Sequence, residues 1–367
     1  MTASEPSTVG CHILDASDAI SPEWLTRALG DLTDRIVACD VTRIAHGNAL
    51  LSDVHRVGLR YATGNGIGPG SVVVKLAASD PDQRFVAELL GLYRREALVY
   101  ERLVTRLPYR TPTCHLARAS ADGRETTVVL EDLARCAAVD QLTGAPWPVV
   151  LASIEAMAAQ HGAWLEQPEL NELASVLLRL DDPLYTAALP VVFEQGWAIA
   201  RDVLGEQIGR RPAAFAQRWS DELPALVARL ASPPTLLHGD WRADNLYLDG
   251  DTLVVADFQI AGVGSGIYDL AYFAGQSVAP AVRRGRDREL VSRYADALAA
   301  HGVLMDHDAL WDGYRTALLF CLVYPVAAFR AWPEETARGR QLVETMLLRA
   351  ADAIEATDAL DLVHRSR

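Results

Sequence analysis

The stretch from Leu236 to Gln259, LLHGDWRADNLYLDGDTLVVADFQ, gathers the residues of this chain that are best suited to chemistry. Asp240, Asn245 and Asp257 follow one another in it at intervals of five and twelve residues. Clustered carboxylates repel one another unless a positive charge lies among them. Mg²⁺ takes hard oxygen ligands, commonly one or two carboxylates together with water and substrate phosphates. The sequence therefore predicts a magnesium site to which Asp257 and the Asn245 amide oxygen contribute.

Asp240 and Asn245 also have the spacing of a catalytic loop for phosphoryl transfer. HGDWRADN places them five residues apart, as in the HRDxxxxN loop of protein kinases, and Asp257 opens DFQ where that template has DFG. The transferring phosphoryl group carries spread negative charge, so catalysis consists mainly of positioning and electrostatic stabilisation. In this interpretation Asp240 orients an acceptor hydroxyl and takes its proton as the new bond forms.

One lysine stands out in a chain that otherwise uses arginine for positive charge. Lys and Arg total 34, and Lys75 is the single lysine, so the other 33 are arginines. A compact ammonium in the apolar stretch SVVVKLA indicates a function that a planar guanidinium cannot serve, although survival by chance is the alternative. Glu96 shares the apolar stripe of a predicted helix with Tyr93 and Tyr100, where a carboxylate is unfavourable unless paired. We therefore expect Lys75 and Glu96 to pair.

The elements that must position these residues form two predicted lobes. Residues 41–76 are expected to form three strands, VTRIA, DVHRVGLRY and SVVVKLA, because apolar residues alternate in them. A helix follows over Pro81–Arg106, and TTVVLEDLA leads as a strand into a hinge near Glu131. Beyond the hinge the pattern is helical almost to the end, apart from PTLLHGD, NLYLD and TLVVADF. The prediction is an α+β fold with a small β-rich N-terminal lobe, residues 1–132, and a larger mainly helical lobe, residues 133–367.

Length, charge and cysteine content limit the class of protein. At 367 residues the chain is long for one hydrophobic core, since single cores stop growing near roughly 250 to 300 residues. The net charge of −14 argues against a nucleic-acid partner, because such binders present a basic face to phosphates. The longest apolar run, Ala317–Phe329, has 13 residues where roughly 20 are needed to cross a bilayer, so we expect a buried core helix and no membrane partner. The five cysteines show no metal-like spacing and no basic residue precedes Arg27, which favours a cytoplasmic protein. The sequence does not indicate an oligomeric state.

The motifs HGDWRADN, VVADFQ and GIYDLAYF together resemble the kinase-like superfamily of aminoglycoside and choline phosphotransferases, and most of all its ecdysteroid kinase-like branch. The resemblance covers roughly residues 41–273 in order. It implies a protein-kinase-like bilobal fold that uses ATP and Mg²⁺. Lys75 would contact the α- and β-phosphates with Glu96 as its partner, and Asp240 would be the catalytic base. Asn245 and Asp257 would be the metal ligands.

The resemblance also implies roles for less distinctive positions. The turn Gly47–Asp53, which overlaps the stretch HGNALLS, would cover the phosphates, with Ser52 as the polar contact. The backbone of the hinge at Glu131 and Leu133 would hold the adenine. Asp269 in YDL would brace the catalytic loop from the following helix. The first turn departs from a full GxGxxG motif, so its contacts with the nucleotide are the least determined.

A small molecule with a hydroxyl group is the expected phosphate acceptor. Only 11 residues separate Asp257 from Asp269, which leaves no room for the activation loop and peptide platform of a protein kinase. Helices around residues 180–220 and 310–330 should form the wall of the acceptor site. The second is apolar and aromatic, which favours a hydrophobic alcohol over a polycationic antibiotic, unless this run only fills the core.

Two other functions fit part of the pattern. A nucleotide-binding pseudokinase would have the same fold without turnover, but its usual mark is the loss of the lysine, the base or a metal ligand, and all of these are present. A metal-dependent hydrolase could gather the same carboxylates, but such sites usually need two or three histidines, and His238 is the single histidine between His161 and His301.

Several further polar residues are expected to have structural roles. His238 should brace its loop by a hydrogen bond to the backbone, and His161 should be a satisfied core histidine. Trp241 and Arg242 either line the acceptor site or, in the case of Trp241, pack in the core. The cluster of Arg283 with its three neighbouring arginines up to residue 288 is expected to be a solvated surface.

Overall fold

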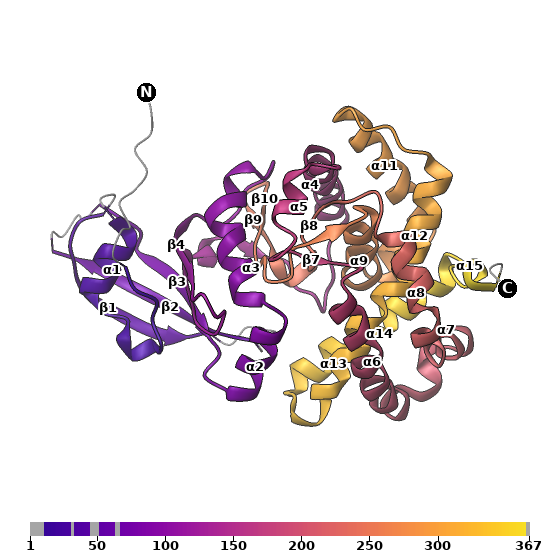
Figure 1. Ribbon diagram of the computed structural model, residues 1–367, viewed down its shortest axis with the longest axis horizontal. Coiled ribbons are helices and arrows are strands. Elements are labelled where there is room, and N and C mark those ends of the chain that lie inside the picture. Colours follow the sequence, from indigo (N-terminus) through magenta and orange to yellow (C-terminus); the bar gives the residue numbers. More distant parts are fainter. Residues whose placement is uncertain (1–10, 31–32, 45–50, 63–66, 365–367) are drawn as a thin grey trace. The chain divides into compact units, whose positions relative to one another are not determined.

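The computed structural model describes residues 11–30, 33–44, 51–62 and 67–364, which divide into two compact units (Figure 1). Unit 1 consists of Met1–Ala137 with Val254–Gln259, and unit 2 of Ala138–Leu253 with Ile260–Arg367. The segment Val254–Gln259, which carries Asp257, thus packs with unit 1, whereas the sequence placed it in the second lobe. The reason is the packing of this segment against the helix of Glu96, described below.

Unit 1 is built on an antiparallel sheet of five strands in the order β1-β2-β3-β5-β4. The strands are β1 (Ile36–Arg43), β2 (Ser52–Tyr61), β3 (Ser71–Ala77), β4 (Cys114–Ala119) and β5 (Thr126–Glu131). The sequence therefore predicted the strands at SVVVKLA and DVHRVGLRY, while β1 begins five residues before the expected VTRIA. Unit 1 also contains the short helices η1 (Ser17–Ala19), α1 (Pro22–Leu29) and η5 (Leu133–Arg135). Trp24 and Leu25 of α1 are buried against one face of the sheet, which gives that face its core.

The helix predicted over Pro81–Arg106 is interrupted. It consists of α2 (Pro81–Leu89), α3 (Leu92–Leu98), the π-helical turn η3 (Val99–Leu103) and η4 (Val104–Arg106). Gly91 has a φ of 65°, a left-handed conformation that suits glycine and ends α2. Tyr93, Glu96 and Tyr100 are buried on one stripe as predicted. The apolar spacing also predicts Leu89, four residues before Tyr93, on this stripe; that prediction is wrong, since the break turns Leu89 outward and leaves it 70% exposed.

Unit 2 is mainly helical and is organised around α9 (Ile267–Ser277), whose residues are all buried. Helices α4 (Trp147–Trp164), α12 (His307–Cys321) and α14 (Ala337–Ala356) pack against it (Figure 1). The remaining described helices of this unit are α5 (Glu169–Glu172), α6 (Pro183–Leu204), η6 (Gly205–Ile208), α7 (Arg210–Ala216), α8 (Trp219–Leu230), η7 (Ala243–Asn245), α10 (Pro280–Arg283), α11 (Asp287–Ala300), α13 (Val323–Ala328), η8 (Phe329–Glu334) and α15 (Asp361–His364).

Short strands complete the fold in two small sheets. One has the order β7-β11-β8, formed by β7 (Leu178–Arg179), β8 (Thr235–Leu237) and β11 (Gly262–Gly264). The other has the order β10-β9-β6, formed by β6 (Ala137–Ala138), β9 (Leu246–Asp249) and β10 (Thr252–Val255). β8 leads directly into the stretch HGDWRADN, so the first of these sheets fixes where that stretch begins.

The apolar run Ala317–Phe329 is confirmed as a core element, formed by the end of α12 and by α13. The helical segment His307–Pro333 is long and apolar enough, by length and composition, to cross a membrane. However, 61% of its most apolar window is buried inside the protein, as in a core helix. Tyr314, Phe320 and Leu319 are among its fully buried side chains.

Candidate active site

Lys75 lies on the face of the unit 1 sheet that is opposite to the α1 core. Successive side chains of a strand point to opposite faces, and Val72, Val74 and Leu76 of β3 belong to the core beneath α1. Lys75 therefore points the other way, toward α3. Its side chain is 9% exposed, its Nζ forms an ion pair with Glu96 Oε1, and the same Nζ lies 3.4 Å from Asp257 Oδ1. The predicted pairing of Lys75 with Glu96 is present.

The charge of Lys75 is maintained by these two carboxylates. Burial alone lowers the pKa of a lysine, but the charges of Asp257 and Glu96 outweigh it and raise the pKa of Lys75 above its usual value. Burial raises the pKa of Glu96, while Lys75 opposes that shift by favouring the charged form. The arrangement keeps an ammonium group available at neutral pH, as phosphate binding would require.

Asp257 is held in an uncommon backbone conformation. Its φ is 68°, in the left-handed region that residues other than glycine rarely adopt. The Asp257 N–H donates to the Tyr100 hydroxyl at 3.4 Å, and the next residue, Phe258, packs edge-on against the Tyr100 ring at 5.5 Å. Strain of this kind persists where the surroundings over-determine it, and it clusters at functional sites. The Asp257 side chain remains 31% exposed, so a ligand can reach its carboxylate.

Gln259, for which the sequence suggested no role, connects three parts of this cluster. Its Nε2 donates to Ser52 Oγ at 2.8 Å and to Glu96 Oε2 at 3.4 Å, and its carbonyl accepts a hydrogen bond from Arg95 Nη1 at 2.9 Å. Its position in DFQ, where the template has a glycine, was the signal that could have revealed it. A glycine has no side chain that could make these bonds.

The remaining residues predicted to contact the nucleotide lie at or just beyond the ends of strands. Ser52 begins β2 and is buried; of the predicted phosphate-covering turn Gly47–Asp53, residues 47–50 lie outside the described residues. The Glu131 side chain, at the end of β5, accepts hydrogen bonds from Arg110 Nη2 at 2.5 Å and from the Thr113 N–H at 3.1 Å. Leu133 follows in η5. Adenine binding by the backbone at Glu131 and Leu133 stays a prediction.

The loop that follows β8 in unit 2 is braced by Asp269 of α9, as predicted. The buried Asp269 carboxylate accepts the N–H groups of His238 at 2.8 Å and of Gly239 at 3.0 Å. Gly239 has a φ of 84°, and a Cβ there would lie 2.1 Å from the carbonyl oxygen of Ile260, so this turn requires glycine. His238 Nδ1 accepts the Asp240 N–H at 3.2 Å, which confirms its expected role as a brace of the loop.

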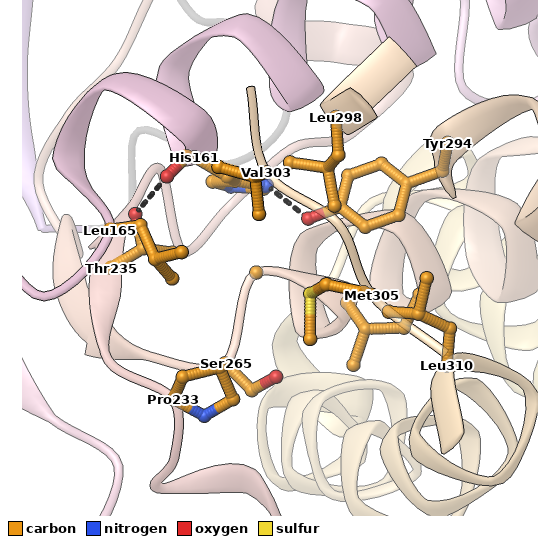
Figure 2. A pocket seen from close by; sticks show the side chains of 12 residues that line it. His161, Leu165, Pro233, Thr235, Ser265, Tyr294, Leu298, Val303, Met305 and Leu310 are labelled. Carbon is orange, nitrogen blue, oxygen red and sulfur yellow. Dashed lines mark hydrogen bonds between the residues drawn. The ribbon is translucent and has the colours of Figure 1, made fainter. Parts of the chain in front are cut away.

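His161 supports Asp269 from behind. Its Nε2 lies 3.1 Å from Asp269 Oδ2, its Nδ1 lies 2.8 Å from the Tyr294 hydroxyl, and its carbonyl accepts a hydrogen bond from Thr235 Oγ1 at 2.8 Å. Figure 2 shows these last two bonds at the wall of a small pocket lined mostly by apolar side chains. His161 is therefore a satisfied core histidine, as expected, and not a ligand.

Asp240 accepts hydrogen bonds from three side chains of the described part of unit 2. Arg242 Nε and Asn245 Nδ2 each donate to Oδ2 at 3.0 Å, and the Tyr272 hydroxyl donates to Oδ1 at 2.7 Å. Asn245 Nδ2 also donates to the Asp240 carbonyl at 2.9 Å, so the amide oxygen of Asn245 is the atom left to bind a metal. The Asp240 side chain is 18% exposed and can be reached by a substrate.

Tyr272 was not recognised from the sequence, although it stands in the motif YDLAYF. It follows Asp269 by three residues, and residues three apart share one side of a helix. That spacing could have suggested that both side chains face the same loop. Trp241, by contrast, is fully buried and packs edge-on against the His238 ring at 5.5 Å, so it is a packing residue.

Comparison with known proteins assigns the chain to a family. The model of the ecdysteroid kinase-like family matches residues 46–305. The chain belongs to this family. No curated protein sequence matches the chain.

Solved structures with the same fold are phosphotransferases for small molecules. Choline kinase from Cryptosporidium parvum Iowa II has a TM-score of 0.57 at 10% identity, over 89% of this chain and 91% of that one. The GDP complex of aminoglycoside 2′-phosphotransferase-IIIa has 0.54 at 15% identity, over 87% and 94%. Plasmodium vivax ethanolamine kinase has 0.51 at 12% identity, over 87% and 84%. These similarities establish that the ecdysteroid kinase-like protein has the α+β fold of the protein-kinase-like phosphotransferases.

The loop of residues 238–245 in this ecdysteroid kinase-like protein is also anchored on its far side. The Ala243 N–H donates to Gln141 Oε1 at 2.9 Å and to Ser277 Oγ at 3.0 Å, while the Gln141 N–H donates to Asp244 Oδ1 at 3.0 Å. The buried Arg349 holds the Gln141 carbonyl through Nη1 at 2.6 Å. Asp244 therefore caps a turn of the loop and is not directed to chemistry.

The oxygen atoms of the two predicted metal ligands are of the kind that magnesium takes. Within the residues that the structure describes, no three His, Cys, Asp or Glu side chains come together as a metal site. The candidate ligands are the Asp257 carboxylate in unit 1 and the Asn245 amide oxygen in unit 2. Mg²⁺ is typically bound through one or two such oxygens, with water and phosphate oxygens completing the octahedron.

The expectation that the arginine cluster from Arg283 to Arg288 is solvated is wrong in part. The Arg283 side chain is fully buried and forms ion pairs with Asp287 at 2.7 Å and with Asp352 at 2.6 Å. The exposed Arg284 pairs with the same Asp352. Arg288 lies over the ring of Trp311, at 4.4 Å from its centroid. This cluster joins helices of unit 2 through ion pairs, and it has no part in the proposed chemistry.

Proposed function

We propose that this ecdysteroid kinase-like protein transfers the γ-phosphoryl group of ATP to a hydroxyl of a small molecule in the presence of Mg²⁺. The observation that carries the proposal is the buried ammonium of Lys75, held between Glu96 and Asp257. A lysine fixed by a helix carboxylate, next to a metal-binding aspartate, is the arrangement that phosphoryl transfer requires for binding the triphosphate. A purely structural ion pair would need neither the partly exposed Asp257 nor its strained backbone.

Each unit has its own part in the proposed reaction. In unit 1, Lys75 binds phosphate oxygens, Glu96 fixes the lysine, and Asp257 is a metal ligand. In unit 2, Asn245 is the second metal ligand and Asp240 is the base. Bound Mg²⁺ would neutralise charge on the phosphate oxygens and orient the group to be transferred.

Asp240 acts on the acceptor hydroxyl. It takes the hydroxyl proton as the acceptor oxygen bonds to the γ-phosphorus and as the bond from that phosphorus to the ADP oxygen breaks. The proton becomes acidic only as the new bond develops, so a carboxylate of ordinary basicity suffices. Arg242 Nε donates to the same carboxylate at 3.0 Å and helps to hold it in place.

The test is a turnover assay with ATP and Mg²⁺ against a panel of hydroxylated compounds. The panel follows the names of the family and of the similar structures: an ecdysteroid, choline, ethanolamine and kanamycin. We expect ADP and a phosphorylated compound in equal amounts with at least one acceptor, and no product when EDTA removes the metal. GTP is assayed in parallel, because the aminoglycoside phosphotransferase structure contains GDP.

Three other results would contradict the proposal. Release of free phosphate without a phosphorylated acceptor would indicate a hydrolase. Nucleotide binding by calorimetry with no turnover over a wide set of alcohols would indicate a pseudokinase. The absence of nucleotide binding would exclude both kinase and pseudokinase.

A further inference from the structure

The two oxygens of the Asp240 carboxylate are occupied to different degrees. Oδ2 accepts hydrogen bonds from Arg242 and Asn245, both at 3.0 Å, whereas Oδ1 accepts one, from Tyr272 at 2.7 Å. Each carboxylate oxygen has about two lone pairs. Oδ2 is therefore saturated, and Oδ1 keeps one lone pair next to the Tyr272 hydroxyl.

We infer that Tyr272 is a positioning residue for the phosphoryl transfer proposed above, and this inference rests on that function. Its hydroxyl fixes the Asp240 carboxylate in one orientation and directs the remaining lone pair of Oδ1 to the acceptor hydroxyl. The acceptor proton moves to Oδ1 as the oxygen–phosphorus bond forms and the bond to the ADP oxygen breaks. Tyr272 keeps its own proton and stabilises the charged carboxylate that exists before the transfer.

The packing of Tyr272 gives its hydroxyl a single position. The residue lies on the buried helix α9, three residues after Asp269, which holds the backbone of the same loop. The Tyr268 ring lies parallel to the Tyr272 ring at 6.1 Å, and the Tyr324 ring stands perpendicular to it at 5.1 Å. Tyr268 and Tyr324 are themselves joined by a hydrogen bond of 2.6 Å. A ring enclosed in this way has little freedom to turn, so its hydrogen bond to Asp240 is pre-organised.

The surroundings of Tyr272 keep its hydroxyl protonated. Burial, reinforced by the charge of Asp240, raises the pKa of Tyr272 well above its usual value, so the hydroxyl remains a donor throughout an ordinary assay range. Tyr324 and the Cys321 thiol, which face Tyr272, also have pKa values raised by burial and stay neutral.

The variant Tyr272→Phe removes the hydroxyl and keeps the ring. Without this hydrogen bond the Asp240 carboxylate is no longer held in the orientation that meets the acceptor hydroxyl. We expect kcat with ATP and Mg²⁺ to fall about 10-fold, with the KM for ATP unchanged. The acceptor is the compound of the panel (an ecdysteroid, choline, ethanolamine or kanamycin) that the wild type phosphorylates fastest.

Tyr314→Phe is the matched control. Tyr314 is also a buried tyrosine of unit 2 whose hydroxyl donates to a carboxylate at 2.8 Å, but its acceptor is Asp287. We expect it to lose a similar amount of thermal stability and to keep the wild-type kcat. If Tyr272→Phe folds and has the kcat of the control, the inference is wrong.

A second measurement decides the question without turnover. In protein labelled with ¹³C at the tyrosine Cζ, the Tyr272 signal should differ between the wild type and Asp240→Asn at one fixed pH, because the hydroxyl donates to a carboxylate in the first and to an amide in the second. A Tyr272 signal that is the same in both proteins would overturn the inference, whether or not Tyr272→Phe folds. If the wild type phosphorylates no acceptor while this difference is seen, the proposed function fails and the contact between Tyr272 and Asp240 stands.

Discussion

The residues around Lys75 in unit 1 and those around Asp240 in unit 2 are held by different forces. Lys75 is buried with two carboxylates, and its position depends on compensation between charges. Asp240 lies on a loop in which the buried carboxylate of Asp269 fixes the backbone N–H groups of His238 and Gly239. Breaking a buried ion pair leaves an unpaired charge and costs about 3–5 kcal/mol, whereas losing one hydrogen bond to a charged group costs about 1.5–3 kcal/mol. Substitutions in unit 1 should therefore affect stability and nucleotide affinity together, and those in unit 2 should mainly affect turnover.

The largest expected effect is that of Asp240→Asn. An amide of the same shape cannot accept the proton, so kcat should fall about 1,000-fold while the Kd for ATP, measured by calorimetry, stays within about two-fold of the wild type. Asp251→Asn is the control, because Asp251 is exposed in the turn between β9 and β10. Near-normal turnover in Asp240→Asn would remove the base from the mechanism and with it the contrast between the two units.

Lys75→Arg should have the next largest effect, and it acts on binding. The guanidinium keeps the charge but is a planar fork where a compact ammonium sits between Glu96 and Asp257. We expect the KM for ATP to rise about 10-fold and the melting temperature to fall, with a smaller change in kcat. Arg43→Lys, at an exposed ion pair of the same sheet, should leave both unchanged. An unaltered ATP dependence in Lys75→Arg would contradict phosphate binding by this residue.

The parts of the site that could be predicted are those in which one segment carries its own signal. A single lysine in an apolar strand and a glutamate on an apolar helical stripe each required a partner, and the pair is present. His161 could be predicted in the same way, since a buried polar group must be hydrogen-bonded, whereas the bracing role of Asp269 came from the family resemblance. The roles of Asp240 and Asn245 were inferred from their spacing and from the same resemblance, and they stay predictions.

The parts that could not be predicted depend on contacts between distant segments. Gln259 bonds to Ser52 across 207 residues, and Arg283 is buried because Asp352, 69 residues later, reaches it. Neither partner is visible in the local pattern, so an arginine cluster resembled an ordinary solvated surface. The break of the predicted helix at Gly91 is a different failure, because glycine lowers helix stability without specifying that the chain must turn.

Gln259→Leu should give a smaller effect that is confined to unit 1. The substitution removes the hydrogen bonds to Ser52 and Glu96 and keeps a side chain of similar size. We expect a loss of about 1 kcal/mol in the free energy of unfolding, measured with urea, and a rise of a few-fold in the KM for ATP. Gln195→Leu, at an exposed position of α6, is the control. A fall in kcat at saturating ATP, without a change in KM, would show that Gln259 acts on turnover and not on the nucleotide side.

The smallest effect is the contribution of Lys75 to stability at high pH. Its folded pKa is raised above the ordinary 10.5, so the unfolded chain loses this proton first. The stabilisation is fully present below pH 10.5 and decreases as the pH rises from there toward the folded value. By pH 11 the loss in the free energy of unfolding should be about 1 kcal/mol. The buried tyrosines of unit 2 also titrate in this range, so the quantity to compare is the difference in unfolding free energy between the wild type and Lys75→Met/Glu96→Leu, which replaces the pair by apolar side chains. That difference should change between pH 9 and 11 in favour of the variant. A constant difference would mean that Lys75 is not held by charge in the folded protein, and the contrast between the two units would then be lost.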